Sequence, residues 1–306
     1  MHFCPKNDIL KSEKSPRKEA AMPTLTDPAV IKELLQRHGF SFSRALGQNF
    51  IIDPRICPRI AEEGNAQSGF GVLEIGTGIG VLTKELALRA DKVTAIEIDK
   101  RLLPILEETL AEFNNINIIN ADVMKCDLHE IIRENFGGLR VAVCANLPYY
   151  ITSPILMLLL ESHLPIDSIT VMVQKEAAQR LCAKVGTRES GAITVGVNYY
   201  GTAQKLFDVS RGCFMPSPNV DSAVIRIDLN QEGRLSPEEE KFFFRMVKSG
   251  FSQRRKTAAN AFASLMDIPK EQTYSALESL GLPKTARIES LDMEQLIALS
   301  RKLKNI

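Results

Sequence analysis

Four consecutive residues, Asn146-Leu147-Pro148-Tyr149, have the types needed to make an aromatic amine reactive. Such an amine is a poor nucleophile because its lone pair is delocalised into the ring. We expect the Asn146 side-chain carbonyl and the Leu147 main-chain carbonyl each to accept one N–H, which frees the lone pair. Pro148 restricts Leu147 to an extended conformation, and Tyr149 would stack on the ring. A general base is not required, because positioning and desolvation supply most of the catalysis.

A proline-bounded loop at residues 214–222 offers a second aromatic side chain to the same ring. We expect Phe214 to contact the opposite face, since a two-sided clamp offsets the cost of extruding a base from its stack. The alternative is that Phe214 is an ordinary core aromatic. Residues 146–149 taken alone also fit a turn that merely ends a strand.

A glycine turn, Gly76-Thr77-Gly78-Ile79-Gly80, follows a strand-like run at 72–75. Glycine allows positive φ and lets the backbone approach a ligand closely. The spacing is Gly-x-Gly-x-Gly, and Val81 stands where the dinucleotide fingerprint Gly-x-Gly-x-x-Gly has its third glycine. The turn therefore favours a nucleoside without a pyrophosphate.

Two acidic residues follow the next two strand-like runs. Glu97 comes about 20 residues after Gly76, where a carboxylate can accept both ribose hydroxyls of an adenosyl group. Asp122 follows the run after that and would accept the adenine amine. Either acid alone fits a polar strand end, but the two together, in step with the glycine turn, favour a nucleoside site.

Five β-branched runs alternate with helical stretches, at 71–75, 92–96, 116–119, 140–145 and 168–173. This alternation predicts the α/β class, with a doubly wound, mainly parallel, Rossmann-like sheet, helices on both faces and ligands at the carboxyl ends of the strands. Residues 220–229 are expected to add an antiparallel strand. Near the N-terminus, Asp27 and Pro28 predict the start of a helix that ends at Gly39.

The last part of the chain is predicted to be a small all-helical domain. After a break at 230–235, Ser236, Pro237 and Glu239 form a capping-box start, and residues 292–295 open the last helix. Residues 1–22 are polar and Lys-rich, a composition typical of disorder. We therefore divide the chain into a disordered tail at 1–22, an α/β domain at 23–230 and a helical domain at 231–306.

Composition excludes several classes of protein. The chain has 306 residues, 44% hydrophobic and 25% charged, which is ordinary globular material. No apolar run approaches the roughly 20 residues of a spanning helix, and the N-terminus lacks a signal-peptide core, so we expect a cytoplasmic protein with no membrane partner. Six scattered cysteines and four histidines predict no metal site and no disulfide framework. A net charge of +1 requires any basic surface to be local.

These motifs resemble the ribosomal RNA adenine dimethyltransferases that modify two adjacent adenosines near the 3′ end of small-subunit rRNA. The resemblance runs through most of the chain, in Leu46-Gly47-Gln48-Asn49-Phe50-Ile51, Glu74-Ile75-Gly76, Ile96-Glu97-Ile98-Asp99, Asn146-Leu147-Pro148-Tyr149-Tyr150, Gln174-Lys175-Glu176, Pro218-Asn219-Val220-Asp221-Ser222-Ala223-Val224 and Phe251-Ser252-Gln253-Arg254-Arg255-Lys256-Thr257.

The resemblance implies the cofactor, the substrate and further site residues. The cofactor is S-adenosyl-L-methionine, bound by the 23–230 domain, and the substrate is 16S rRNA in the loop of its 3′-terminal hairpin, within the small ribosomal subunit or its precursor. Each adenine N6 amine would receive up to two methyl groups, and the enzyme would act as a monomer in ribosome biogenesis. The cofactor pocket would include Asn49, Ile51, Gly76, Glu97, Asp122 and Asn146. Two departures are that Thr77 replaces the family's usual proline and that residues 1–22 have no counterpart.

A basic helix face would hold the RNA. On a helical wheel, one stripe carries Lys241, Arg245, Lys248 and Arg255, while Phe243, Met246 and Val247 lie opposite. The residues expected to contact phosphate are Arg245, Lys248, Arg254, Arg255 and Lys256. The alternative is a solvated helix surface without a ligand. RNA shape and an unpaired loop would then select the substrate.

Three other functions remain open on the sequence. One is a macrolide-resistance enzyme of related fold that acts on large-subunit rRNA. The residues of the motifs at 46–50, 146–150 and 253–257 favour the small-subunit enzyme instead. A second is a ribosome-assembly factor that only binds, which the presence of Asn146, Tyr149, Glu97 and Asp122 disfavours. The third is a nicotinamide dehydrogenase, for which the third glycine and a recognisable catalytic His or Lys are missing.

Overall fold

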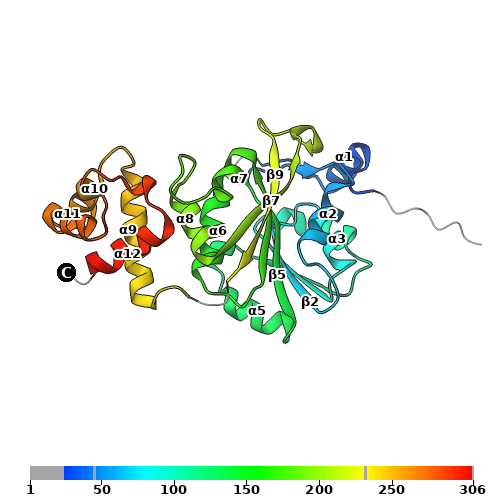
Figure 1. The fold of residues 1–306 in the computed structure, drawn as a ribbon. Coiled ribbons are helices and arrows are strands. Elements are labelled where there is room, and N and C mark those ends of the chain that lie inside the picture. The colour runs from blue at the N-terminus through cyan, green and yellow to red at the C-terminus, as the bar shows by residue number, and fades with distance from the viewer. Residues whose placement is uncertain (1–23, 44–45, 231–232, 305–306) are drawn as a thin grey trace, which may run out of the picture.

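The computed structural model describes residues 24–43, 46–230 and 233–304; the predicted tail at 1–22 lies outside these ranges. A seven-stranded sheet forms the centre, in the order β4-β3-β2-β5-β6-β9-β7 (Figure 1). Its strands are β2 (Phe70–Ile75), β3 (Lys92–Glu97), β4 (Ile116–Asn120), β5 (Arg140–Asn146), β6 (Ser168–Gln174), β7 (Gly201–Val209) and β9 (Ser222–Leu229). Strands β2 to β6 are parallel, and β9 is antiparallel to both β6 and β7. The predicted fold class and the antiparallel late strand are confirmed.

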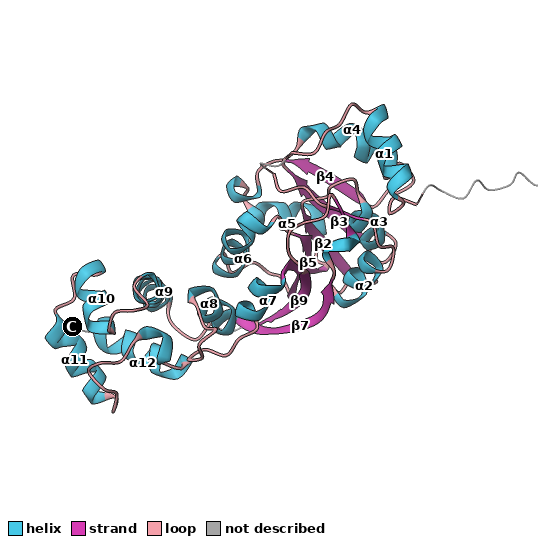
Figure 2. Cartoon of the chain, turned by 90° about the horizontal axis from the view of Figure 1, so that it is seen from above, coloured by secondary structure: helices cyan, strands magenta, loops and turns pink. Residues whose placement is uncertain are grey.

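Helices cover both faces of the sheet (Figure 2). One face carries α2 (Ile56–Glu63) and α3 (Val81–Ala87), and the other carries α5 (Leu128–Phe136) and α6 (Thr152–Glu161). The central strands β2, β5 and β6 are buried on both faces, which is why their sequences are continuous apolar runs. Chain order reverses between β2 and β5, so the carboxyl ends of these two strands flank a switch point.

Strand β7 is not predicted from the sequence. It lies at the edge of the sheet, its side chains are mostly half-buried or exposed, and its pairing with β9 is irregular between Lys205 and Phe207. An edge strand with one solvent-exposed face lacks the continuous apolar run by which a central strand is recognised in the sequence. A short pair, β1 (Phe50–Ile51) with β8 (Phe214–Met215), is also not predicted.

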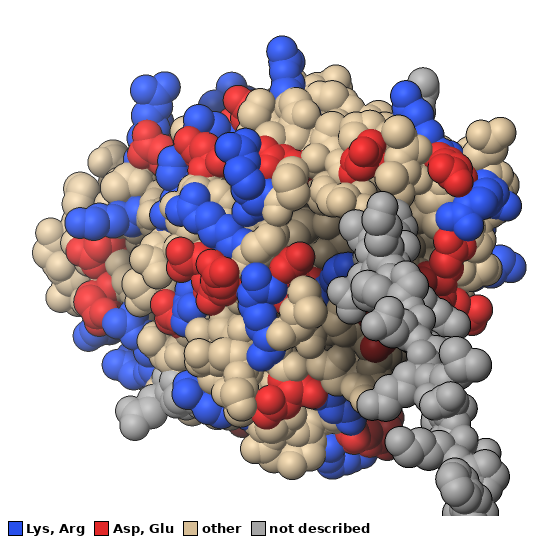
Figure 3. Space-filling view, turned by 90° about the vertical axis from the view of Figure 1, so that its right-hand side faces the viewer, with Lys and Arg blue, Asp and Glu red and all other residues tan. Residues whose placement is uncertain are grey.

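The predicted helix starts are confirmed. Helix α1 (Pro28–Arg37) is capped by Asp27, which accepts from the Ala29 amide, and Gly39 has φ +59° just beyond its end. The end of the molecule with α1, α2 and α3 bears Lys and Arg interspersed with Asp and Glu (Figure 3). It therefore presents no continuous basic field. Among the described residues no helix is long and apolar enough to cross a membrane.

Four helices form the C-terminal part: α9 (Pro237–Ser252), α10 (Ala258–Leu265), α11 (Lys270–Ser279) and α12 (Met293–Lys304). The Ser236–Glu239 capping box opens α9, and Asp292 and Gln295 cap each other's amides at the start of α12. One expectation is wrong: α9 ends at Ser252, so Arg255 lies in the following turn and does not extend the stripe of Lys241, Arg245 and Lys248.

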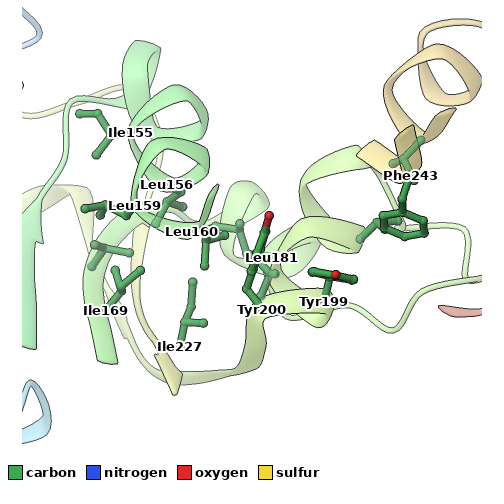
Figure 4. Close-up of a cluster of buried hydrophobic side chains, with 14 of the residues drawn as sticks. Ile155, Leu156, Leu159, Leu160, Ile169, Leu181, Tyr199, Tyr200, Ile227 and Phe243 are labelled. Atoms are coloured by element: carbon green, nitrogen blue, oxygen red, sulfur yellow. The ribbon is translucent and has the colours of Figure 1, made fainter. Parts of the chain in front are cut away.

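Helix α9 joins the main core through the end of α8 (Ala192–Tyr200) (Figure 4). The Tyr199 and Phe243 rings stack with centroids 5.4 Å apart. Buried Glu240 accepts hydrogen bonds from the Tyr199 and Tyr200 hydroxyls at 3.0 and 2.7 Å and lies 2.9 Å from His163 Nε2. One apolar cluster thus continues from the sheet into the helical region.

Candidate active site

A cavity of about 1150 Å³, its open mouth included, lies at the carboxyl ends of β2, β3 and β5. This is the switch point where doubly wound sheets bind ligands. All nine residues predicted for catalysis or cofactor binding line it: Asn49, Ile51, Gly76, Glu97, Asp122, Asn146, Leu147, Tyr149 and Phe214. Their roles stay predictions, but the structure brings them together from six separate segments of the chain.

The glycine turn forms one wall of the cavity. Gly76, Gly78 and Gly80 have φ of +79°, +55° and +90°, a region that side-chain-bearing residues rarely adopt. A Cβ at Gly76 would meet no heavy atom within 4 Å, so the backbone borders open space at Gly76, whereas Gly78 and Gly80 face Phe50 and Leu110. The turn is thereby shaped to let a ligand approach the main chain.

Glu97 is buried at the end of β3 and is already well supplied with donors. Its Oε2 accepts from the Thr77 amide and hydroxyl, both at 2.9 Å, and from the Gly78 amide at 3.3 Å. Within the described ranges, its Oε1 accepts only from the Asp99 amide, at 2.9 Å. Because a carboxylate oxygen has two lone pairs, Oε1 keeps one acceptor position for a ligand hydroxyl.

The segment before β1 is tied to the end of β3. Gln48 Nε2 donates to Asp99 Oδ2 at 2.8 Å, while the neighbouring Asn49 side chain donates to the Gly47 carbonyl at 3.0 Å. The Arg101 guanidinium beside Asp99 holds the pKa of that carboxyl below its usual value. Asp122 is half-buried and caps the turn after β4 by accepting from the Met124 amide at 3.1 Å. These bonds fix the cavity's polar side chains before any ligand binds.

The two acceptors expected to hold the amine have no hydrogen-bond partner among the residues that the structure describes. Among the described residues, none donates to the Asn146 side chain or to the Leu147 carbonyl, whereas the adjacent Pro148 carbonyl accepts from Ile151 and Thr152. Leu147 itself is held by its amide, which donates to the Met172 carbonyl at 3.3 Å, and by its fully buried side chain. Within the described residues, the structure thus offers the cavity one main-chain carbonyl that is held in place and one side-chain carbonyl without a hydrogen-bond partner.

The two predicted aromatic contacts differ in how they are held. Tyr149 is half-buried, and its hydroxyl is 2.7 Å from the Ser222 hydroxyl at the start of β9, which fixes the ring. Burial raises the pKa of Tyr149. Phe214 is only 4% exposed and pairs with Ile51 through β8 and β1. Phe214 therefore belongs to the core as well as to the cavity wall. This position is compatible with both interpretations, an ordinary core aromatic and a contact to the target base.

The sequence did not single out a buried carboxyl at the base of the cavity. Glu74 is 0% exposed on β2, and neither of its oxygens has a hydrogen-bond partner among the described residues. Burial raises the pKa of Glu74 to about 8; the Thr83 hydroxyl opposes this without reaching hydrogen-bond geometry. The available signals were its position two residues before Gly76 and its place in the quoted motif Glu74-Ile75-Gly76. Other lining residues, among them Gln48, Ile98 and Tyr150, were likewise quoted only within motifs.

The predicted phosphate-contacting cations lie away from the cavity and are not equivalent. Arg245, Lys248, Arg255 and Lys256 are exposed and form no ion pair within the described parts of the chain. Arg254 instead pairs with Glu289 at 2.7 Å and donates to the Arg188 carbonyl at 3.2 Å. Arg254 is therefore engaged with Glu289 at the protein surface and is less available to an RNA phosphate than the other four cations.

The sheet order, the glycine turn and the acids at the strand ends define a Rossmann-like methyltransferase. The family model described as "Ribosomal RNA adenine dimethylase" matches residues 39–305. The chain is 47% identical over 285 residues to "Ribosomal RNA small subunit methyltransferase A" of Geobacillus thermodenitrificans, covering 91% of this chain and 97% of that protein.

Two solved structures share most of the fold. "23S rRNA methyltransferase ErmE" has a TM-score of 0.64 and 30% identity, covering 84% of this chain and 100% of its own. A dimethyladenosine transferase from Plasmodium falciparum has a TM-score of 0.65 and 26% identity, covering 82% and 95%. The chain belongs to the ribosomal RNA adenine dimethylase family, and its methyl donor is S-adenosylmethionine.

Proposed function

We propose that the chain dimethylates the N6 amines of two adjacent adenosines in the loop of the 3′-terminal hairpin of 16S rRNA. The substrate would be the small ribosomal subunit or its precursor, and the enzyme would act as a cytoplasmic monomer in subunit biogenesis. The observation that carries this proposal is the 47% identity, over 97% of its length, to a protein named for the small subunit. Identity to the named 23S enzyme is lower, at 30%.

The cavity residues divide into a cofactor group and a substrate group. We infer that Asn49, Ile51 and the Gly76 turn border the cofactor, that Glu97 accepts one of its ribose hydroxyls through the remaining position on Oε1, and that Asp122 accepts its adenine amine. The open backbone beside Gly76 and the remaining acceptor on Glu97 fit an adenosyl group. When bound, S-adenosylmethionine supplies an electrophilic methyl group.

Asn146 and Leu147 would activate the substrate amine. Each carbonyl accepts one N–H of the target adenine, so the nitrogen lone pair leaves the ring and points towards the cofactor. Because neither carbonyl has a partner in the described part of the chain, accepting the amine breaks no hydrogen bond found there. Tyr149 stacks on the base, and Phe214 supports the opposite side. After the first transfer the methylated amine is cationic and loses one proton to water. One N–H then remains, so one carbonyl contact still orients the amine for the second methyl group.

The helical region would supply RNA affinity. We propose a methyltransferase domain at 23–230 and an RNA-recognition domain at 231–306, with phosphate contacts from Arg245, Lys248, Arg255 and Lys256. Arg254 would contribute less because of its pair with Glu289. Such contacts add salt-dependent affinity and leave selection to RNA shape.

The test uses the purified protein, labelled S-adenosylmethionine, and separately purified under-methylated small and large subunits. We expect label in N6,N6-dimethyladenosine of small-subunit RNA, confined to the fragment with the 3′-terminal hairpin. Label only in large-subunit RNA would overturn the substrate, label elsewhere in small-subunit RNA would overturn the address, and no label in either would overturn the chemistry.

A further inference from the structure

Tyr150 differs from every other aromatic side chain at the cavity. It is 61% exposed, whereas Phe50 and Phe214 are 5% and 4% exposed and Tyr149 is half-buried. Within the described residues, it is the one aromatic member of the set of exposed large apolar side chains. An exposed aromatic ring at the mouth of a binding cavity needs an explanation that packing does not provide.

The ring is nonetheless held in place. Tyr150 lies in the short helical turn η3 (Tyr149–Ile151), directly after the half-buried Tyr149, and lines the same cavity. A Cβ built on Gly47 would lie 3.5 Å from both Cδ1 and Cε1 of Tyr150, so the ring rests against the Gly47 backbone. The Tyr150 hydroxyl forms no hydrogen bond with any described residue. The ring is thus backed by protein on one side and open on the other.

The other exposed apolar lining residue occupies a different end of the cavity. Ile98 is 52% exposed and directly follows Glu97, the residue assigned to the cofactor ribose. Tyr150 follows the residues assigned to the target base. A ring at that end, outside the buried part of the cavity, is placed for the substrate rather than for the cofactor.

A base that enters the cavity leaves its neighbour unstacked. Aromatic side chains bind unstacked bases through their π-faces with little dependence on base identity. We propose that Tyr150 is a substrate-positioning residue that stacks on the nucleotide adjacent to the target adenine while that adenine occupies the cavity. The proposal rests on the proposed RNA-adenine function and adds a second base contact to it.

The first experiment measures methylation of under-methylated small subunits by Tyr150→Ala and Tyr150→Phe, together with cofactor affinity. Tyr150→Ala is expected to raise KM for the subunit about 5- to 150-fold, the range of one lost stacking contact, with the Kd for S-adenosylhomocysteine within about twofold of wild type. Tyr150→Phe should stay near wild type because the ring is kept. Leu88→Ala, which removes an exposed apolar side chain at the end of α3, away from the cavity lining and from the helical region, is the matched control and should leave KM unchanged.

The second experiment pairs these variants with a hairpin RNA whose loop carries an abasic nucleotide beside the target. Removing the neighbouring base should weaken wild-type binding as much as Tyr150→Ala does, and the two changes together should cost no more than either alone. Independent, additive losses would overturn the stacking role, as would a normal KM for Tyr150→Ala or an equal defect in Tyr150→Phe. Absence of methylation by the wild-type protein would refute the proposed function instead.

Discussion

The cavity and the helical region use their polar side chains in opposite ways. In the cavity, the Glu97 carboxylate accepts four hydrogen bonds from the protein, whereas the Asn146 side-chain carbonyl accepts none from the described residues. In the helical region, Arg255 and Lys256 are exposed cations without ion pairs among the described residues, and Arg254 is held by Glu289. The cavity's groups are fixed and few, so each matters singly, whereas the exposed cations act through their number and distribution.

The sharpest way to break this comparison is to remove the unused acceptor in the cavity. Asn146→Ala is expected to lower kcat about 10³-fold, because loss of one fixed polar contact to the reacting group costs about that much. RNA affinity should stay within about threefold, since the α9 cations are untouched. Single-turnover methylation and equilibrium RNA binding measure the two effects.

The matched control is Asn117→Ala, an exposed asparagine on β4. It should retain wild-type turnover. Near-normal turnover in Asn146→Ala would refute the acceptor role, and an equal loss in both variants would point to general damage to the sheet.

A second test concerns the buried carboxyl below the same cavity. Burial raises the pKa of Glu74 to about 8, against 4.5 in the unfolded chain. Below pH 4.5 both states hold the proton and stability is unaffected. As pH rises from 4.5 to about 8 only the unfolded chain ionises, so the free energy of unfolding falls by up to about 1.4 kcal/mol per pH unit.

Glu74→Gln removes that titration. Its urea midpoint relative to wild type should therefore rise between pH 5 and pH 8, by an amount set by that slope. Glu33→Gln, an exposed change on α1, should follow the wild-type curve at all pH values. Parallel curves for Glu74→Gln and wild type would show that Glu74 is not protonated in the folded protein.

The smallest effect is expected in the helical region. Replacing Arg255 and Lys256 together with Ala should flatten the plot of log Kd for single-stranded RNA against log salt by about 1.4, because each lost phosphate contact removes about 0.7. Adding Arg254→Ala should change the slope less than either of the others, given its pair with Glu289. Lys32→Ala with Arg133→Ala, exposed cations on α1 and α5, is the charge-matched control. An unchanged slope would sink the phosphate-contact role.

The same contrast explains what the sequence could reveal. Parallel strands buried on both faces appear as apolar runs, so β2, β3 and β5 were predictable, and with them the ends that carry Gly76, Glu97 and Asn146. Strand β7 was not, because an edge strand with polar positions looks like a loop. The position of Asn49 came only from family resemblance, since it precedes the first regular strand of the sheet.

Contacts between residues far apart in the sequence cannot be predicted from local sequence patterns. Arg254 forms an ion pair with Glu289, 35 residues further along the chain. Glu97 accepts hydrogen bonds from the amide and the hydroxyl of Thr77. A proline, which is usual at this position in the resembled family, could donate neither bond. The helical wheel put Arg255 on the same face as Arg245 because it assumed that one helix contains both residues. Helix α9 ends at Ser252. Each of these facts depends on where the chain folds back.

The cluster that joins α8 to α9 has a consequence for how the molecule comes apart. Cutting the chain at residue 230 would uncover the stacked face of Tyr199 and strip Tyr199 and Tyr200 of the carboxylate that accepts their hydroxyl hydrogens. We therefore expect that the helical region does not fold independently of the end of α8. Heating should melt it together with the sheet in one cooperative transition, and grafting it onto another methyltransferase would require transplanting the end of α8 as well.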